Sequence, residues 1–412
     1  MDAIERISFR VETSPQSGVG VLLMLPSAWN GRFVGVGSGG AGGVLRDDAL
    51  LPYARQGYAA AMTDLGTAPD TRLAGWRNQD VLRDFGHRAT HVMTLAAKEC
   101  VSAKYGRSPE FSYFVGASTG GQQEFSEAQR YPEDYDGILA GVPAHCRTRL
   151  HAYFLWNWQR TLRQDGSPLF SKEQLAVIRA ASLDAFAPRE KFPGAVGRFV
   201  SAPRWDDTTI ADAIAIAARR DSSLGCEHLA ALEELFRGPR HAVTGAKIFD
   251  GIPPAARFDL ARSNLYLFNW AFGPDVDYAA LDFGPDYDRY FAALAPELDA
   301  EDENLDAFRD RGGKMVVYAG TQDSCVPCGA TLDYYSRLAT RLGGPEAALG
   351  FCQLFLLPGR EHFGGKGIQE IRRPLEALRR WREKGIPPSM EGVSCTEHRV
   401  VPLSPWTPDG GR

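Results

Sequence analysis

In the first third of the chain, short apolar runs alternate with longer segments of helical spacing. The runs 33–36, 57–62 and 111–115 are apolar or β-favouring, and each is stopped by a glycine or by polar residues. Residues 84–104 instead place apolar side chains at intervals typical of a helix, with no glycine or proline after position 88. Strand runs separated by a helix of this length predict βαβ units and a parallel sheet.

The last hundred residues return to the same alternation. Runs 314–319 and 353–357 predict buried strands, and each is followed by a turn that contains glycine. Segments 330–342 and 369–384 predict the helices that cover them. Both ends of the chain therefore contribute to one α/β core.

The middle of the chain interrupts this pattern. It is rich in Pro, Gly and Arg, lacks clear strand runs and holds half of the aromatic residues, in clusters such as 153–158 and 266–272. The rings either line a substrate pocket beneath a lid or form a second core, and the sequence leaves both open. We expect a catalytic core of residues 1–145 and 311–412 and a mainly helical insertion at 146–310.

Composition narrows the class of protein. With 44% hydrophobic and 24% charged residues among 412, the chain is typical of a globular enzyme. A net charge of −5 argues against a nucleic acid or an anionic membrane as partner. No apolar run approaches the roughly 18 residues of a membrane span, and the acidic start Met1–Ile7 is not a secretory signal. We expect a cytoplasmic protein.

The seven cysteines do not form a disulfide framework. They are scattered and odd in number, and Cys325 and Cys328 are the only C-x-x-C pair. A second pair at zinc spacing is missing, so reduced thiols near a loop are favoured over a metal site or a redox pair.

The strongest local motif is the G-x-S-x-G at 116–120, with Ser118 at its centre. The strand run 111–115 precedes it, and a helix start follows at about residue 122. Strand, sharp turn and helix are the setting of a nucleophile elbow, in which the turn exposes a serine hydroxyl. Such a serine needs a base and an orienting carboxylate before it can attack a carbonyl.

Position along the chain selects those two partners. In α/β-hydrolases the acid and then the histidine follow the serine, each on a loop after a core strand. Asp323 follows the 314–319 run and His362 follows the 353–357 run. The competing Asp333 falls inside a predicted helix, and His398 lies among charged residues near the C-terminus.

Two backbone N–H groups are also needed for the oxyanion of an acyl-transfer intermediate. Thr119, the residue after the serine, supplies one. The glycine-rich loop 37–43 supplies the other, and we favour Gly40, followed by Gly39. Residues 35–40 also match the dinucleotide-binding pattern G-x-G-x-x-G. No predicted helix begins directly after these glycines, so a dinucleotide site is not favoured.

The chain resembles the tannase and feruloyl esterase family of α/β-hydrolases over nearly its whole length. The most specific block surrounds Ser118 and extends to the stretch EAQRYPEDYDGI at 127–138. Other similar segments are 29–33 with the glycine loop, 57–64, 238–254, 305–314 and 332–335. The resemblance implies an α/β-hydrolase fold with a lid, and a triad at Ser118, Asp323 and His362.

Three departures from the family pattern change what the resemblance implies. Ala117 and Phe363 stand where members usually carry a linked pair of cysteines, so packing replaces a disulfide, as suits a reducing compartment. The acidic calcium loop has no counterpart after Ser171, so we expect no metal ion. Thr67 replaces a frequent histidine, which leaves substrate recognition open.

These inferences together predict a serine hydrolase of aromatic carboxylic esters, such as aryl, depside or lactone-like compounds, with no cofactor. An acyltransferase or cyclase with the same nucleophile, or a non-catalytic binding protein with the hydrolase fold, remains an alternative. The oligomeric state is open, with a homodimer as one option.

Overall fold

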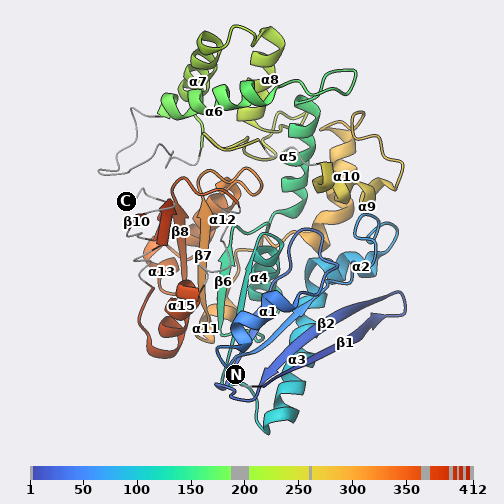
Figure 1. Ribbon diagram of the computed structural model, residues 1–412, viewed down its shortest axis with the longest axis vertical. Helices are drawn as coiled ribbons and strands as arrows, with labels where there is room; N and C mark the ends of the chain where they lie inside the picture. The colour runs from blue at the N-terminus through green and yellow to red at the C-terminus, as the bar shows by residue number, and fades with distance from the viewer. Residues whose placement is uncertain are drawn as a thin grey trace.

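The computed structural model describes residues 3–186, 204–258, 262–362, 372–388, 393–396, 399–401 and 405–408. Its centre is an eight-stranded sheet in the order β1-β2-β4-β3-β5-β6-β7-β8 (Figure 1). β2 is antiparallel to β1 and β4, and the remaining pairs are parallel. The strands are β1 (Ile4–Ser14), β2 (Ser17–Pro26), β3 (Arg32–Val36), β4 (Ala59–Thr63), β5 (Phe111–Ala117), β6 (Gly137–Gly141), β7 (Lys314–Gly320) and β8 (Cys352–Leu357).

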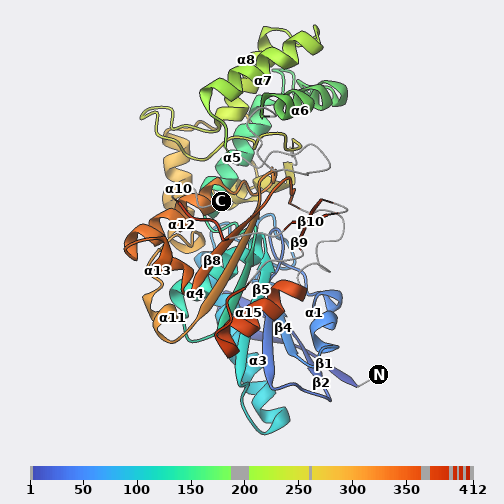
Figure 2. The same ribbon diagram turned by 90° about the vertical axis from the view of Figure 1, so that its left-hand side faces the viewer.

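Helices cover both faces of this sheet because successive side chains of each strand point to opposite sides. On β5, Phe114 packs toward α3 (Ala89–Tyr105) and α4 (Thr119–Arg130), whose cluster continues over α11 (Asp306–Asp310) and α12 (Gly329–Arg341). Tyr113 and Val115 pack toward α1 (Asp47–Ala54) and α15 (Arg372–Lys384) on the other face. Figure 2 shows the sheet between these two layers. The expected α/β fold with a mostly parallel sheet is confirmed.

A helical insertion separates β6 from β7 and lies beyond the carboxyl ends of the parallel strands (Figure 1). Its longer helices are α5 (Arg147–Arg160), α6 (Lys172–Phe186), α7 (Asp207–Arg220), α8 (Cys226–Arg237), α9 (Tyr266–Phe272) and α10 (Pro285–Leu298). Tyr153, Phe268 and Trp270 are buried in one cluster, so these rings form a second core rather than an open aromatic pocket. None of the helices in the described ranges is long and apolar enough to cross a bilayer.

Besides the long hairpin of β1 and β2, several of the elements that the hydrophobic pattern left out are small or irregular. They include the short helices α2 (Gln79–Arg83) and α13 (Pro345–Leu349), the 3₁₀ turn Arg262–Leu265, and the hairpin of β9 (Val393–Thr396) and β10 (Arg399–Val401). A π-helical turn, Asp84–Arg88, joins α2 to α3. The predicted helix at 84–104 is therefore present, but its first turn is wound more widely than an α-helix.

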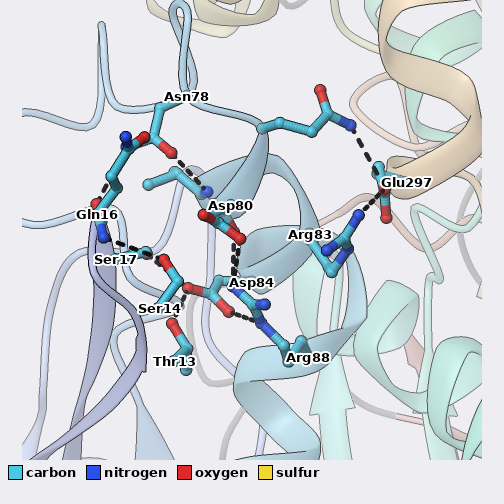
Figure 3. Close-up of polar contacts among 12 residues, drawn as sticks. Thr13, Ser14, Gln16, Ser17, Asn78, Asp80, Arg83, Asp84, Arg88 and Glu297 are labelled. Atoms are coloured by element: carbon cyan, nitrogen blue, oxygen red, sulfur yellow. Dashed lines mark hydrogen bonds and ion pairs between the residues drawn. The ribbon is translucent and has the colours of Figure 1, made fainter.

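That π-helical turn ties the N-terminal hairpin to the core through Asp84 (Figure 3). One carboxylate oxygen of Asp84 accepts the hydroxyls of Thr13 and Ser17, both at 2.6 Å. The other oxygen accepts Arg88 Nε at 2.5 Å, and Arg88 also reaches Asp80. The Asp84 carboxylate is fully buried, and these bonds satisfy both of its oxygens.

Candidate active site

Ser118 lies at the turn between β5 and α4, where it is the N-cap of the helix. Its backbone has φ +61° and ψ −115°, a conformation that residues with a side chain rarely adopt. The turn is crowded: a Cβ at Gly116 would lie 2.9 Å from the Gly120 Cα. The predicted strand, turn and helix around Ser118 are thus confirmed, and their geometry is that of a nucleophile elbow.

The loops that carry the predicted acid and base lie at the same edge of the sheet as this turn. Ser118 N–H donates to Gly141 O at the end of β6, at 2.9 Å. Tyr318 O, near the end of β7, accepts Val142 N–H at 2.7 Å, and Gln322 N–H donates to Arg360 O at 3.0 Å. The segments after β5, β6, β7 and β8 are therefore linked one to the next.

Asp323 and His362 form a buried pair on these loops. Nδ1 of His362 lies 2.7 Å from Asp323 Oδ2. The second oxygen, Oδ1, accepts the N–H groups of Cys325 at 2.9 Å and Val326 at 2.8 Å, and Asp323 is fully buried. The carboxylate therefore favours a proton on Nδ1, so that Nε2 is the nitrogen without a proton in the neutral ring.

The same contacts set the charge of the imidazole. Burial by itself lowers the pKa of His362. The hydrogen bonds to Asp323 and Cys325 and the charge of Asp323 outweigh this effect and raise the pKa to about 10. The imidazolium form is thus stabilised by the carboxylate behind the ring. This is the electrostatic arrangement that a histidine needs when it takes a proton from a nucleophile.

The predicted oxyanion donors are free to bind. In the described part of the chain, the N–H groups of Gly39, Gly40 and Thr119 make no hydrogen bond. Among the described residues, the Ala41 N–H is likewise without a hydrogen bond, whereas the N–H groups of Gly37, Ser38, Gly42 and Gly43 in the loop after β3 are bonded. Unbonded N–H groups beside a nucleophile elbow are what an oxyanion site requires.

Side chains from outside the loop anchor its carbonyls. Thr119 Oγ1 donates to Gly40 O at 2.6 Å, and Thr67 Oγ1 donates to Ala41 O at 2.6 Å. Thr67, which the sequence marks only as a departure from the family, therefore helps to hold the glycine loop.

Arg147 also reaches Gly40 O, at 2.7 Å, and was absent from the predicted site. No sequence signal points to it, because its partners lie 28 and 107 residues away.

The remaining candidates from the sequence lie elsewhere. Asp333 is in α12, as predicted, and pairs with Arg204 at 2.6 Å. His398 and Phe363 fall outside the described residues. After Ser171 the chain enters α6 directly. The six cysteines whose side chains are described are free thiols, with Cys325 half-buried and Cys328 buried.

One group among the described residues has metal-ligand chemistry. Potential ligand atoms of His145, Cys146 and Glu301 lie within 4.8 Å of one another. Glu301, however, already pairs with Arg149 and with Arg337, the latter at 3.7 Å. A cation would have to compete with these two guanidinium groups for the carboxylate, so we assign no metal site here.

Comparison with solved structures supports the class of protein that this architecture defines. Feruloyl esterase B from Aspergillus oryzae superposes with a TM-score of 0.84 at 21% identity, covering 98% of this chain and 87% of that one. Tannin acyl hydrolase from Aspergillus niger gives 0.78 at 18% identity, covering 98% and 87%. The fold is that of an α/β-hydrolase.

Sequence comparison narrows this class to a family. The model described as tannase and feruloyl esterase matches residues 6–264 and 271–400. A probable feruloyl esterase B of Aspergillus niger is 28% identical over 89% of this chain and 72% of its own length. An uncharacterized esterase of Xanthomonas campestris pv. campestris is 30% identical, over 90% and 74%. The chain therefore belongs to the tannase and feruloyl esterase family of carboxylic ester hydrolases.

Proposed function

We propose that the chain hydrolyses an aromatic carboxylic ester, with Ser118 as nucleophile, His362 as general base and Asp323 as the group that orients it. The observation that carries this proposal is the 2.7 Å contact between His362 Nδ1 and the buried Asp323 carboxylate, on loops at the sheet edge where the Ser118 elbow lies. Two loops after different strands thus place a buried carboxylate behind an imidazole, which is the support that a general base requires.

The reaction proceeds in two halves. Ser118 Oγ attacks the ester carbonyl while His362 Nε2 takes its proton, and the resulting imidazolium gives that proton to the departing alcohol. Water then attacks the acyl-enzyme, with His362 again accepting a proton, and the acid is released. Asp323 keeps its charge throughout and stabilises the imidazolium.

The tetrahedral intermediates carry negative charge on the former carbonyl oxygen. The N–H group of Thr119 and one from the glycine loop, at Gly40 or Gly39, bind this oxygen. Their lack of other hydrogen bonds supports the assignment, since no existing bond must be broken when the oxyanion forms.

The aromatic character of the substrate is supported by the family relationship. The names of the relatives refer to feruloyl esters and tannins, in which a phenolic acid is esterified. The ring-rich composition of the insertion adds less, because side chains such as Phe268 and Trp270 are already buried against other residues. We therefore propose a phenolic acyl group and leave the alcohol unspecified.

Covalent labelling and a substrate panel test this function. We expect a fluorophosphonate to label the wild type and Ser102→Ala, a control on α3, but not Ser118→Ala. Methyl esters of phenolic acids should be hydrolysed faster than short aliphatic esters. Absence of labelling and of hydrolysis would refute the proposal, a preference for aliphatic esters would overturn the substrate class, and dominant acyl transfer to an added alcohol would favour a transferase.

A further inference from the structure

Arg147 is a buried cation that links the helical insertion to the glycine loop. It is the first residue of α5, and only 3% of its surface is exposed. Nη1 donates to Thr119 Oγ1 at 2.9 Å, and Nη2 donates to Gly40 O at 2.7 Å. Nη2 also contacts the hydroxyl of Tyr266 at the start of α9.

These contacts fix the peptide planes of the loop. In a trans peptide the C=O and the following N–H point in opposite directions. Thr119 and Arg147 hold the Gly40 carbonyl, so the Ala41 N–H is held on the opposite side. Gly42 N–H binds the Gly39 carbonyl at 3.1 Å, which fixes the Gly40 N–H in the same way. The loop donors are therefore set before any substrate arrives.

The guanidinium also brings charge to this place. In the described part of the chain, no carboxylate lies within ion-pair distance of Arg147. Aromatic rings enclose it instead, with Cζ 5.2 Å from the centre of Phe85 and 5.9 Å from that of Tyr266. This charge acts on a neighbouring side chain. The pKa of His151 is lowered mainly by burial and in addition by the charge of Arg147. A developing oxyanion beside Thr119 would be stabilised by the same field.

We propose that Arg147 is a positioning residue for ester hydrolysis. It holds the Gly40 carbonyl and the Thr119 hydroxyl, which fixes the glycine loop against the elbow and keeps the backbone N–H groups of Gly40 and Thr119 beside the oxyanion, and its charge favours that anion. This inference rests on the proposed function, because it concerns the intermediate of the same reaction. The effect falls on the transition state and not on substrate binding.

Steady-state kinetics of Arg147→Met, Arg147→Lys and Arg160→Met on a phenolic methyl ester test the proposal. Arg160 is the matched control at the far end of α5, where it pairs with Glu234 at 2.8 Å. We expect Arg147→Met to lower kcat by about 10- to 100-fold with KM within about threefold, because it removes the support of the donors and not a donor itself. Arg147→Lys, which keeps the charge but not the paired geometry, should lower kcat by about 3- to 10-fold. Arg160→Met should stay within about twofold of the wild type.

Binding of an arylboronic acid, which forms a tetrahedral adduct with a nucleophilic serine, separates catalysis from mere stability. Its affinity for Arg147→Met should fall in proportion to kcat. A lower melting temperature with wild-type kcat and boronate affinity would overturn the proposal. If Arg147→Met does not fold, a wild-type kcat in Arg147→Lys would overturn it. These outcomes concern Arg147 alone, whereas a wild type without esterase activity, or an active Ser118→Ala, would refute the proposed function.

Discussion

Asp323 binds His362 with one carboxylate oxygen and two backbone N–H groups with the other. The backbone contacts hold the carboxylate still, so the imidazole is oriented by a group that cannot itself rotate. Full burial of Asp323 keeps water from competing for these bonds. The pair therefore links a rigid loop after β7 to a histidine that belongs to the loop after β8.

Replacement of Asp323 by Asn should lower kcat and displace the pH profile. The neutral amide favours the wrong tautomer of His362, and a loss of about 10³- to 10⁴-fold is expected. In the wild type, Asp323 raises the pKa of His362, so activity increases with pH as the imidazole loses its proton. Asp323→Asn removes that effect and should move the acidic limb of kcat/KM to lower pH. Asp333→Asn is the control, and an unmoved limb in Asp323→Asn would contradict the assignment.

Gly37→Ala should disturb the glycine loop. A Cβ at this position would lie 2.5 Å from the Gly120 Cα, so backbone must move. We expect a loss of about 1–3 kcal/mol in the free energy of unfolding and a lower kcat, since the loop and the elbow are pushed apart. Thermal denaturation and kinetics measure both. Gly225→Ala, which meets open space at the start of α8, should change stability by less than about 1 kcal/mol, and equal behaviour of the two variants would contradict this packing.

Much of the core could be predicted because its signals are local. The apolar runs that became β3, β4, β5, β7 and β8 are short, buried and bounded by glycine or polar residues. Asp323 and His362 could be predicted as a pair from their place after such strands, because the hydrolase order of acid and base is a rule of topology, and the structure brings the two side chains into contact. The hairpin of β1 and β2 was not predicted. The five-residue β6 was missed as well, since it has only three apolar residues between two glycines.

The contacts that position the site could not be found in this way. Arg147 looks like a solvated charge at the start of a helix, and only the folded chain brings it to Gly40. Asp84 likewise lies in a segment of ordinary helical spacing, yet it binds hydroxyls 67 and 71 residues earlier in the chain. Long-range polar contacts leave no periodic trace in the sequence, whereas burial of apolar side chains does.

Glu124→Gln should stabilise the protein at alkaline pH. Burial raises the pKa of Glu124 well above 4.5, more than the nearby Gly116 N–H lowers it. The folded state therefore keeps a proton that the unfolded chain releases, and the free energy of unfolding falls as pH rises above about 4.5, by at most about 1.4 kcal/mol per unit. Urea unfolding at pH 5 and pH 8 should show a larger gain for Glu124→Gln at pH 8. The exposed Glu99→Gln should follow the wild type at both, and a gain independent of pH would contradict the prediction.

Asp84→Asn tests whether the hydrogen bonds of Asp84, drawn in Figure 3, hold the N-terminal hairpin on the core. The substitution keeps the shape of the side chain but removes its charge and one of its two acceptor oxygens, leaving Arg88 or the hydroxyls of Thr13 and Ser17 without a partner. Since Asp84 is fully buried, we expect a loss of about 2–4 kcal/mol in the free energy of unfolding, measured with urea.

Asp47→Asn is the control: it breaks an exposed pair with Arg6 at 2.9 Å and should cost less than about 1 kcal/mol. Asp84→Asn should increase the amide hydrogen exchange of β1 and β2 more than that of β5 and β7. If the hairpin stays as protected as the central strands, Asp84 does not join these two parts of the fold, and the apolar packing of β2 against β4 is sufficient to hold the hairpin in place.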